Sequence, residues 1–168
     1  MRINENLLEK IEYESVYVSY DETTGVAASQ NNYQASRLQF RIPSTLKEGE
    51  LYTFSFDLST ITGSNDITVS TYPDMSNTSI VSANTKRQKI SFKYNGEVQF
   101  VNVYMGIVGR ATGSYRIQNL KLEEGEIATT YLPHKSSVKA ENQAIFPIGG
   151  GTKKCILYNS KGGWVLWE

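Results

Sequence analysis

The sequence predicts an all-β protein, an antiparallel sandwich of seven or eight short strands followed by a C-terminal β-hairpin. Three observations support this prediction. Apolar and polar side chains alternate with a period of two through residues 11–124, as in strands with one buried face. Turns rich in glycine, asparagine and serine separate the alternating runs. The composition, 39% hydrophobic and 20% charged, is that of a globular domain.

Each expected strand has one apolar and one polar side, and the run at 98–105 is apolar on both sides. We therefore expect that run at the centre of a sheet, with one side on the core and the other partly covered by a loop, a ligand or a neighbouring subunit. Turn residues are expected at 43–49, 63–66, 94–96, 109–113 and 123–125. The expected strands are residues 16–20, 37–42, 52–58, 67–72, 88–94, 98–105 and 114–122.

The pattern changes after Tyr131. Residues 1–133 form the predicted sandwich domain, and the polar stretch 134–144 that follows Pro133 is predicted to be a linker. Residues 145–168 are predicted to form a hairpin with a five-residue turn, for attachment or for contact between subunits. Trp164 and Trp167 are three positions apart, so in a strand they point to opposite faces, and we expect them to contact a partner in an assembly.

Composition and charge exclude several classes of function. The 17 basic and 17 acidic side chains give zero formal net charge, which argues against a nucleic-acid partner. One cysteine, Cys155, and one histidine, His134, are too few for a disulfide framework or a Cys/His zinc site. No apolar run reaches the ~20 residues that cross a bilayer, so no membrane insertion is expected. The charged N-terminal stretch lacks the apolar region of a signal peptide, which predicts synthesis in a cytoplasm.

Four segments together resemble a known family. They are the N-terminal Asn6-Leu7-Leu8, the strand SRLQFRIP at 36–43, the segment LKEGELYTFSFDLS at 46–59 and the closing segment YRIQNLKLEEGEIATTYLP at 115–133. This order resembles the jelly-roll carbohydrate-binding modules of phage tail and baseplate proteins from phages of Gram-positive bacteria. The closing segment is the most specific part. The resemblance spans residues 6–133 and leaves the C-terminal hairpin unexplained.

The resemblance implies a jelly-roll β-sandwich of about eight strands that binds glycans as part of a host-recognition organelle. It implies a place in the virion, with assembly in the host cytoplasm, and two kinds of partner: the host cell-wall saccharide and other tail or baseplate proteins. A homo-oligomer, such as a trimer, is expected by analogy with tail appendages. No tryptophan precedes Trp164, so a stacking platform in the sandwich has to be built from tyrosine.

Candidate carbohydrate-binding residues are polar or aromatic side chains that share one side of a predicted strand. Sugar hydroxyls need hydrogen-bonding partners and sugar C–H faces pack on flat rings, and arginine also binds phosphate or carboxylate in a bidentate manner. Pairing between the three strands would form one patch. The alternative is an ordinary solvated strand face. The candidates are Arg37, Gln39 and Arg41 on one strand, Thr53, Ser55 and Asp57 on the next, and Asn102 and Tyr104 on a third.

Catalysis is not expected. A glycosidase needs two carboxylates flanking the scissile bond, one of them in a setting that raises its pKa. Glu12 and Glu14 share a strand side and three further glutamates cluster at 123–126, but both groups are interpreted as surface charge. His134 is expected to face solvent and Cys155 to be a structural thiol.

No cofactor is expected. A structural calcium ion is a lesser alternative, because the loops at 20–23 and 63–66 offer only some of the oxygen ligands that it needs.

Three hypotheses remain open. The first is a non-catalytic binding module for host cell-wall saccharide. The second is a purely structural virion protein, used as a spacer, a decoration or a fibre-attachment subunit. The third is an enzyme that degrades cell-wall glycan.

Overall fold

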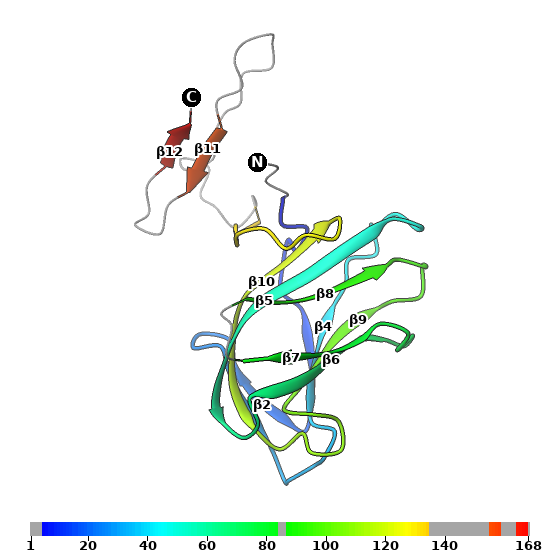
Figure 1. The fold of residues 1–168 in the computed structure, drawn as a ribbon, viewed down its shortest axis with the longest axis vertical. Helices are drawn as coiled ribbons and strands as arrows, with labels where there is room; N and C mark the ends of the chain where they lie inside the picture. The colour runs from blue at the N-terminus through cyan, green and yellow to red at the C-terminus, as the bar shows by residue number, and fades with distance from the viewer. Residues whose placement is uncertain (1–4, 84–86, 135–154, 159–163, 168) are drawn as a thin grey trace.

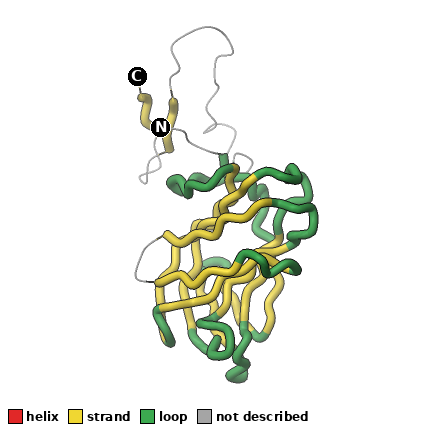
Figure 2. The backbone as a smooth tube through the Cα atoms, turned by 45° about the vertical axis from the view of Figure 1, so that its right-hand side comes forward, coloured by secondary structure: helices red, strands yellow, loops and turns green. Residues whose placement is uncertain are grey.

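The structure, a computed structural model, describes residues 5–83, 87–134, 155–158 and 164–167. Two five-stranded antiparallel sheets pack face to face, with loops at their ends (Figures 1 and 2). Sheet A has the order β1-β4-β9-β6-β7 and sheet B the order β2-β3-β10-β5-β8. Sheet A consists of β1 (Tyr13–Val16), β4 (Arg37–Arg41), β9 (Phe100–Tyr104), β6 (Asp66–Tyr72) and β7 (Thr78–Ser82). Sheet B consists of β2 (Val18–Asp21), β3 (Val26–Ser29), β10 (Ser114–Glu124), β5 (Leu51–Thr62) and β8 (Arg87–Lys93).

The eight strands from β3 to β10 have the jelly-roll order. They form two four-stranded sets, β3-β10-β5-β8 and β4-β9-β6-β7, and consecutive strands alternate between the sheets except at the β6–β7 hairpin. Strands β1 and β2 each add one edge strand. The predicted antiparallel jelly-roll sandwich is therefore confirmed, with ten strands instead of about eight.

The prediction of a single strand at residues 16–20 is wrong, because this region is divided between β1 and β2. Tyr17 has a φ of +52°, outside the extended region, and this break separates β1 in sheet A from β2 in sheet B. Side-chain alternation continues through Tyr17 and gives no sign of the break. Strands β3 and β7 were also not predicted from the alternation. The central placement expected for the 98–105 run is confirmed, since β9 is the middle strand of sheet A.

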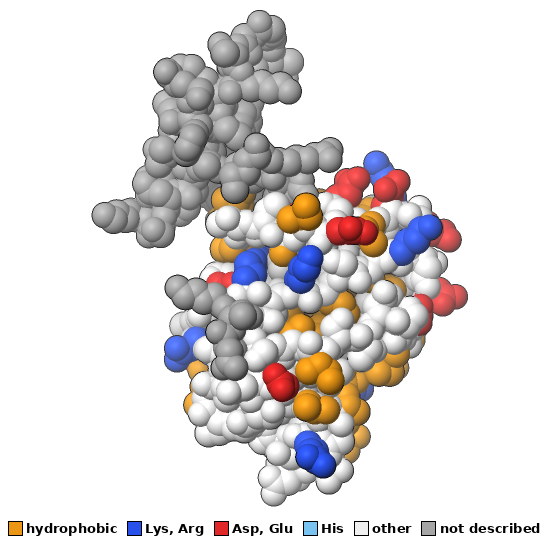
Figure 3. Space-filling view, viewed as in Figure 1, with side chains coloured by type: hydrophobic (Ala, Val, Ile, Leu, Met, Phe, Trp, Pro, Cys, Tyr) orange, Lys and Arg blue, Asp and Glu red, His pale blue; other side chains and the backbone are white. Residues whose placement is uncertain are grey.

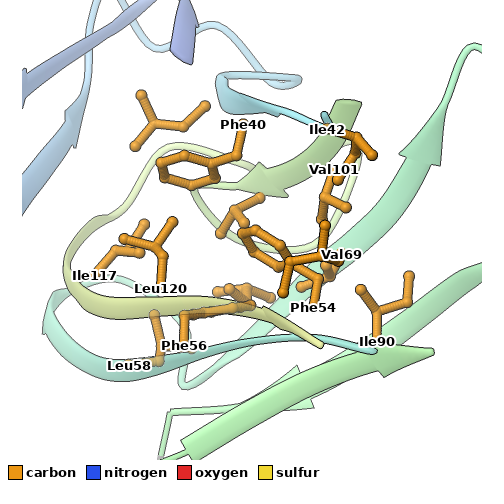
Figure 4. Packing of buried hydrophobic residues seen from close by; sticks show 14 of the residues in the cluster. Phe40, Ile42, Phe54, Phe56, Leu58, Val69, Ile90, Val101, Ile117 and Leu120 are labelled. Atoms are coloured by element: carbon orange, nitrogen blue, oxygen red, sulfur yellow. The ribbon is translucent and has the colours of Figure 1, made fainter. Parts of the chain in front are cut away.

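The core lies between the two sheets. Figure 4 shows aromatic and aliphatic side chains of both sheets pointing toward one another, among them Phe40 from β4 and Phe54 from β5. The centroids of these two rings are 5.8 Å apart and the rings are stacked. Each buried ring contributes about 1.5–3 kcal/mol relative to an exposed one. Because the apolar sides of the strands are used here, their polar sides form the outer faces of the sandwich.

The N-terminal segment is fixed along β10, beyond the part of β10 that pairs with β3. Leu7 N donates to Leu122 O at 2.8 Å. The buried Asn6 amide donates from Nδ2 to Leu120 O, and its Oδ1 accepts from Leu8 N and Leu122 N, all at 3.1–3.2 Å. Asn6 therefore provides the hydrogen bonds that a further strand would provide at this point.

Strands β11 (Cys155–Tyr158) and β12 (Trp164–Trp167) pair antiparallel, so a two-stranded hairpin forms as predicted. The side chains of Trp164 and Trp167 lie outside what the structure describes. The predicted linker, residues 134–144, also lies outside it except for His134. His134 is buried, with 7% of its surface exposed, so the expectation that it faces solvent is wrong. Within the described ranges no helix is long and apolar enough to span a membrane.

Candidate functional site

The outer face of sheet A brings together five of the eight predicted binding residues. On β4 these are Arg37, Gln39 and Arg41, and on the neighbouring β9 they are Asn102 and Tyr104. The register pairs Arg37 with Tyr104, Gln39 with Asn102 and Arg41 with Phe100. Strand β6 continues the last two rows with Ser70 and Tyr72. We call these eight residues the sheet A face.

The middle row of the sheet A face is polar and buried. Gln39 Nε2 donates to Asn102 Oδ1 at 3.0 Å, and Ser70 stands directly beside Asn102 in the register. Asn102 and Ser70 are both 0% exposed. Asn102 Nδ2 and Ser70 Oγ nevertheless have no hydrogen-bond partner among the described residues. Such groups are rare in folded proteins, because desolvation without a replacement hydrogen bond costs roughly 1–3 kcal/mol.

Aromatic rings and guanidinium groups flank the polar row. The Arg37 guanidinium lies over the Tyr104 ring at 5.8 Å, and the Arg41 guanidinium lies over the Phe100 ring at 4.6 Å. Tyr72, beside Phe100, is 39% exposed. The two flanking rows lie about 13 Å apart, since each residue of a strand adds about 3.3 Å. The sheet A face thus consists of a buried polar row with an aromatic row on either side.

The two predicted arginines differ in their partners. Arg41 is exposed and forms ion pairs with Glu14 at 2.9 Å and with Glu12 at 3.8 Å. A hollow of about 420 Å³ lies beside it, lined by residues between 7 and 12 and by residues 41–45. Arg37 is half-buried and forms no ion pair within the described residues. Its Nη1 donates to Ala35 O at 3.3 Å, while its Nε is buried and unpaired.

Thr53, Ser55 and Asp57 do not join this face, so the prediction of one patch across all three strands is wrong. They lie on β5, which belongs to sheet B. On the outer face of sheet B, Ser55 Oγ and Asp57 Oδ1 accept from Arg87 at 2.7 and 3.1 Å. Thr53 Oγ1 donates to Gly125 O at 2.6 Å. The connection after β4 is the reason, because the loop at 42–50 leads from sheet A to sheet B.

A segment that follows β10 covers part of the outer face of sheet B. We call residues 125–131 the strap. Lys89 Nζ donates to Glu126 O at 2.8 Å, and the Arg87 guanidinium lies over the Tyr131 ring at 5.9 Å. Burial raises the pKa of the Tyr131 hydroxyl, and the nearby Arg87 charge opposes this shift. The strap therefore covers Thr53, Lys89 and Arg87 on the outer face of sheet B.

Beneath the strap lies a buried ion pair. Lys121 and Glu123 have side chains that are 0% exposed, with 3.2 Å between Nζ and Oε2. Glu123 accepts from Thr129 N at 2.8 Å and from Thr129 Oγ1 at 2.6 Å, and Lys121 donates to Thr129 Oγ1 and Thr130 O. Burial lowers the pKa of the Lys121 ammonium group. The interpretation of Glu123 as surface charge is therefore wrong.

The set of predicted binding residues lacked three residues of the sheet A face, namely Ser70, Tyr72 and Phe100; Tyr72 was one of five tyrosines of which one or two were considered as stacking residues. Their strands were predicted, but nothing in the alternation of β6 indicates that it lies beside β9. The signal that was available is the double-sided apolar character of residues 98–105, which marked the outward Phe100 and Tyr104 as covered. Two further exposed rings, Tyr17 and Tyr33, lie 4.4 Å apart outside these three strands.

Among the described residues no group of three or more His, Cys, Asp or Glu side chains could hold a metal ion. Asp21, in one of the two loops considered for calcium, accepts instead from Thr24 Oγ1 at 2.7 Å and Thr23 N at 2.9 Å. These hydrogen bonds lower the pKa of Asp21, and the one from the Thr24 side chain has the largest effect. Basic and acidic side chains are interspersed on the face drawn in Figure 3.

The sequence matches no protein-family model and no curated protein. Two of the solved structures that match this chain, both at low similarity, are as follows. One holds the CBM22-1–GH10 modules of Clostridium thermocellum endo-1,4-β-D-xylanase 10B complexed with xylohexaose; it is 13% identical with a TM-score of 0.43, over 76% of this chain and 29% of that one. The other is the CBM22-1 xylan-binding domain of Paenibacillus barcinonensis Xyn10C; it is 12% identical with a TM-score of 0.37, over 76% of this chain and 100% of that one. This chain thus spans less than a third of the xylanase structure.

Proposed function

We propose that the sheet A face binds a saccharide without catalysis, and that the protein recognises host cell-wall saccharide as part of a phage tail or baseplate. The observation that supports binding most directly is the buried row Gln39–Asn102–Ser70, in which two polar atoms have no partner. A ligand that fills this row replaces the missing hydrogen bonds. The outer face of sheet B offers no such row at the predicted positions, because Thr53, Ser55 and Asp57 are already paired.

A saccharide fits this combination of groups. Sugar hydroxyls donate and accept, so they suit amide and hydroxyl groups, and sugar C–H faces suit the rings that flank the row. Tyr72 is the exposed ring of the sheet A face and the one that a ligand meets first. The other two rings, Phe100 and Tyr104, are buried under Arg41 and Arg37.

The carboxylates at the edge of this face favour a binding role over hydrolysis. Glu12 and Glu14 both pair with Arg41, and about half of each side chain is exposed. A general acid needs a desolvated setting that keeps it protonated, and a second carboxylate on the other side of the bond. Both glutamates lie instead on one edge, next to a positive charge.

The virion role rests on the resemblance of residues 6–133 to phage tail modules. In the structure, three of the four segments of that resemblance are joined by hydrogen bonds: Asn6 bonds to β10, and the strap after β10 bonds to β5. Many copies on one particle turn weak single-site binding into firm attachment. The proposed location is therefore the extracellular particle, after assembly in the host cytoplasm.

The test is binding of the purified chain to an array of bacterial cell-wall saccharides, followed by calorimetric titration of the best ligand. We expect Tyr72→Ala to weaken binding roughly 2–10-fold, the range expected for one ring contact. Tyr33→Ala is the matched control, because Tyr33 is 42% exposed and lies outside β4, β9 and β6. No binding to any saccharide, or equal effects of the two variants, would reject the sheet A face as the site.

A further inference from the structure

We propose that the ligand of the sheet A face carries an anionic group, a phosphate or a carboxylate on the sugar, and that Arg37 binds that group. This inference rests on the proposed saccharide-binding function and specifies the class of saccharide.

The charge of Arg37 is not neutralised within the described residues. Four other cations among the described residues have acidic partners: Lys10 has Glu12, Arg41 has Glu12 and Glu14, Arg87 has Asp57, and Lys121 has Glu123. Arg37 is half-buried, and the one hydrogen bond of its guanidinium goes to the neutral carbonyl of Ala35. A desolvated cation without a counter-ion is unfavourable, so an anion that binds there gains more than it would at Arg41.

The unpaired atoms of the sheet A face are all able to donate. Arg37 Nε and Asn102 Nδ2 are donors only, and the Ser70 hydroxyl donates or accepts. These are three of the five buried side-chain atoms without a partner in the described part of the chain. The other two, Arg87 Nε and Thr60 Oγ1, are on sheet B, where Arg87 makes three further hydrogen bonds. A ligand for the sheet A face therefore has to bring acceptors, and phosphate and carboxylate groups are the richest in acceptors.

The Arg37 guanidinium is also held in place before any ligand arrives. Ala35 O fixes Nη1 from one side and the Tyr104 ring lies beneath the guanidinium plane. The fork geometry of arginine suits two oxygens of one anion, and a fixed guanidinium loses little side-chain entropy on binding. Arg41 also lies over a ring, that of Phe100, but its charge is already balanced by two glutamates.

The experiment compares three probes by calorimetric or NMR titration: a neutral hexose oligosaccharide, the same oligosaccharide carrying a phosphate or a uronic-acid carboxylate, and inorganic phosphate. We expect the anionic saccharide to bind about 10-fold more tightly than the neutral one, with an affinity that falls as salt increases. We expect Arg37→Gln to abolish this preference, so that the neutral and the anionic saccharide bind the variant with similar affinity. Arg41→Gln is the matched control and should leave the preference intact.

The possible failures are distinct. If no saccharide binds, the proposed function fails and the inference fails with it. If neutral and anionic saccharides bind equally, or if Arg37→Gln keeps the preference, saccharide binding stands and only the anionic class is overturned. If inorganic phosphate binds as tightly as the phosphorylated saccharide, the sugar is not recognised and the inference is also overturned.

Discussion

The outer faces of the two sheets are built from the same kinds of side chain, yet the side chains predicted to bind a ligand all have partners on sheet B, whereas on sheet A some of their polar atoms lack one among the described residues. On sheet B, Thr53, Ser55 and Asp57 of β5 pair with Arg87, with Ser91 and with the strap. On sheet A, the middle row keeps two atoms without a partner, and Arg37 keeps a third. The difference is that a later segment, the strap, supplies hydrogen-bond partners to the polar face of sheet B, whereas the described residues leave three polar atoms of the sheet A face without a partner.

The largest effect is expected from breaking the buried pair of sheet B. Glu123→Gln keeps the shape of the side chain but leaves the Lys121 charge buried without a counter-ion. We expect the free energy of unfolding to fall by about 3–5 kcal/mol, measured by urea denaturation. Binding at the sheet A face should be unchanged wherever the variant is folded.

The double variant Lys121→Met/Glu123→Leu is the control, because it removes both charges. It should recover most of the stability lost by the single variant. If Glu123→Gln costs less than 1 kcal/mol, the strap does not hold sheet B through this pair, and the contrast between the two faces weakens.

The second largest loss of stability is expected where the N-terminal segment lies along β10. Asn6→Ala removes three buried hydrogen bonds and leaves Leu8 N and Leu122 N unpaired. We expect a loss of about 2–3 kcal/mol in the same assay. Glu9→Ala, at an exposed position of the same segment, should change stability by less than about 0.5 kcal/mol. A similar effect of both variants would mean that Asn6 does not anchor the segment.

The sharpest comparison uses one substitution on each face, since Ser55 and Ser70 are both fully buried and point outward from strands inside their sheets. Ser55→Ala removes an acceptor of Arg87 and should cost about 1–2 kcal/mol. Ser70→Ala removes a hydroxyl that has no partner, so stability should stay the same or rise by up to about 1 kcal/mol.

Saccharide titration completes this pair. Ser70→Ala should weaken binding and Ser55→Ala should not. A destabilised Ser70→Ala variant with normal binding would show that the hydroxyl serves the fold, and would remove the middle row from the site.

The smallest effect is a pH dependence at the edge of sheet B. Burial first, and the nearby Glu22 charge second, raise the pKa of Tyr20 from 10.0 to about 12. The folded state therefore retains this proton longer than the unfolded state. The contribution of neutral Tyr20 to stability is complete below pH 10 and is lost as the pH rises through about 12. Ultraviolet titration should show that Tyr20→Phe loses one tyrosine's absorbance change near pH 12; an unchanged amplitude there would assign the late titration to other tyrosines.

The strand alternation predicted much of the fold and part of the site. It placed Phe40 and Phe54 in the core and put Arg37, Gln39 and Arg41 on one outward side, because a period of two fixes which side of a strand each residue takes. It also indicated that residues 98–105 lie centrally, since both sides of that run are apolar.

The tertiary structure alone decided which outward sides meet. Strand β4 lies next to β9, β9 lies next to β6, and β5 lies in the other sheet. Ser70 is therefore part of the sheet A face and Ser55 is not. The tertiary structure also broke the first expected strand at Tyr17 and buried Lys121 with Glu123 under the strap. The physical reason is that alternation is a local property of each strand, whereas strand order and the covering of a face depend on contacts between residues far apart in the chain.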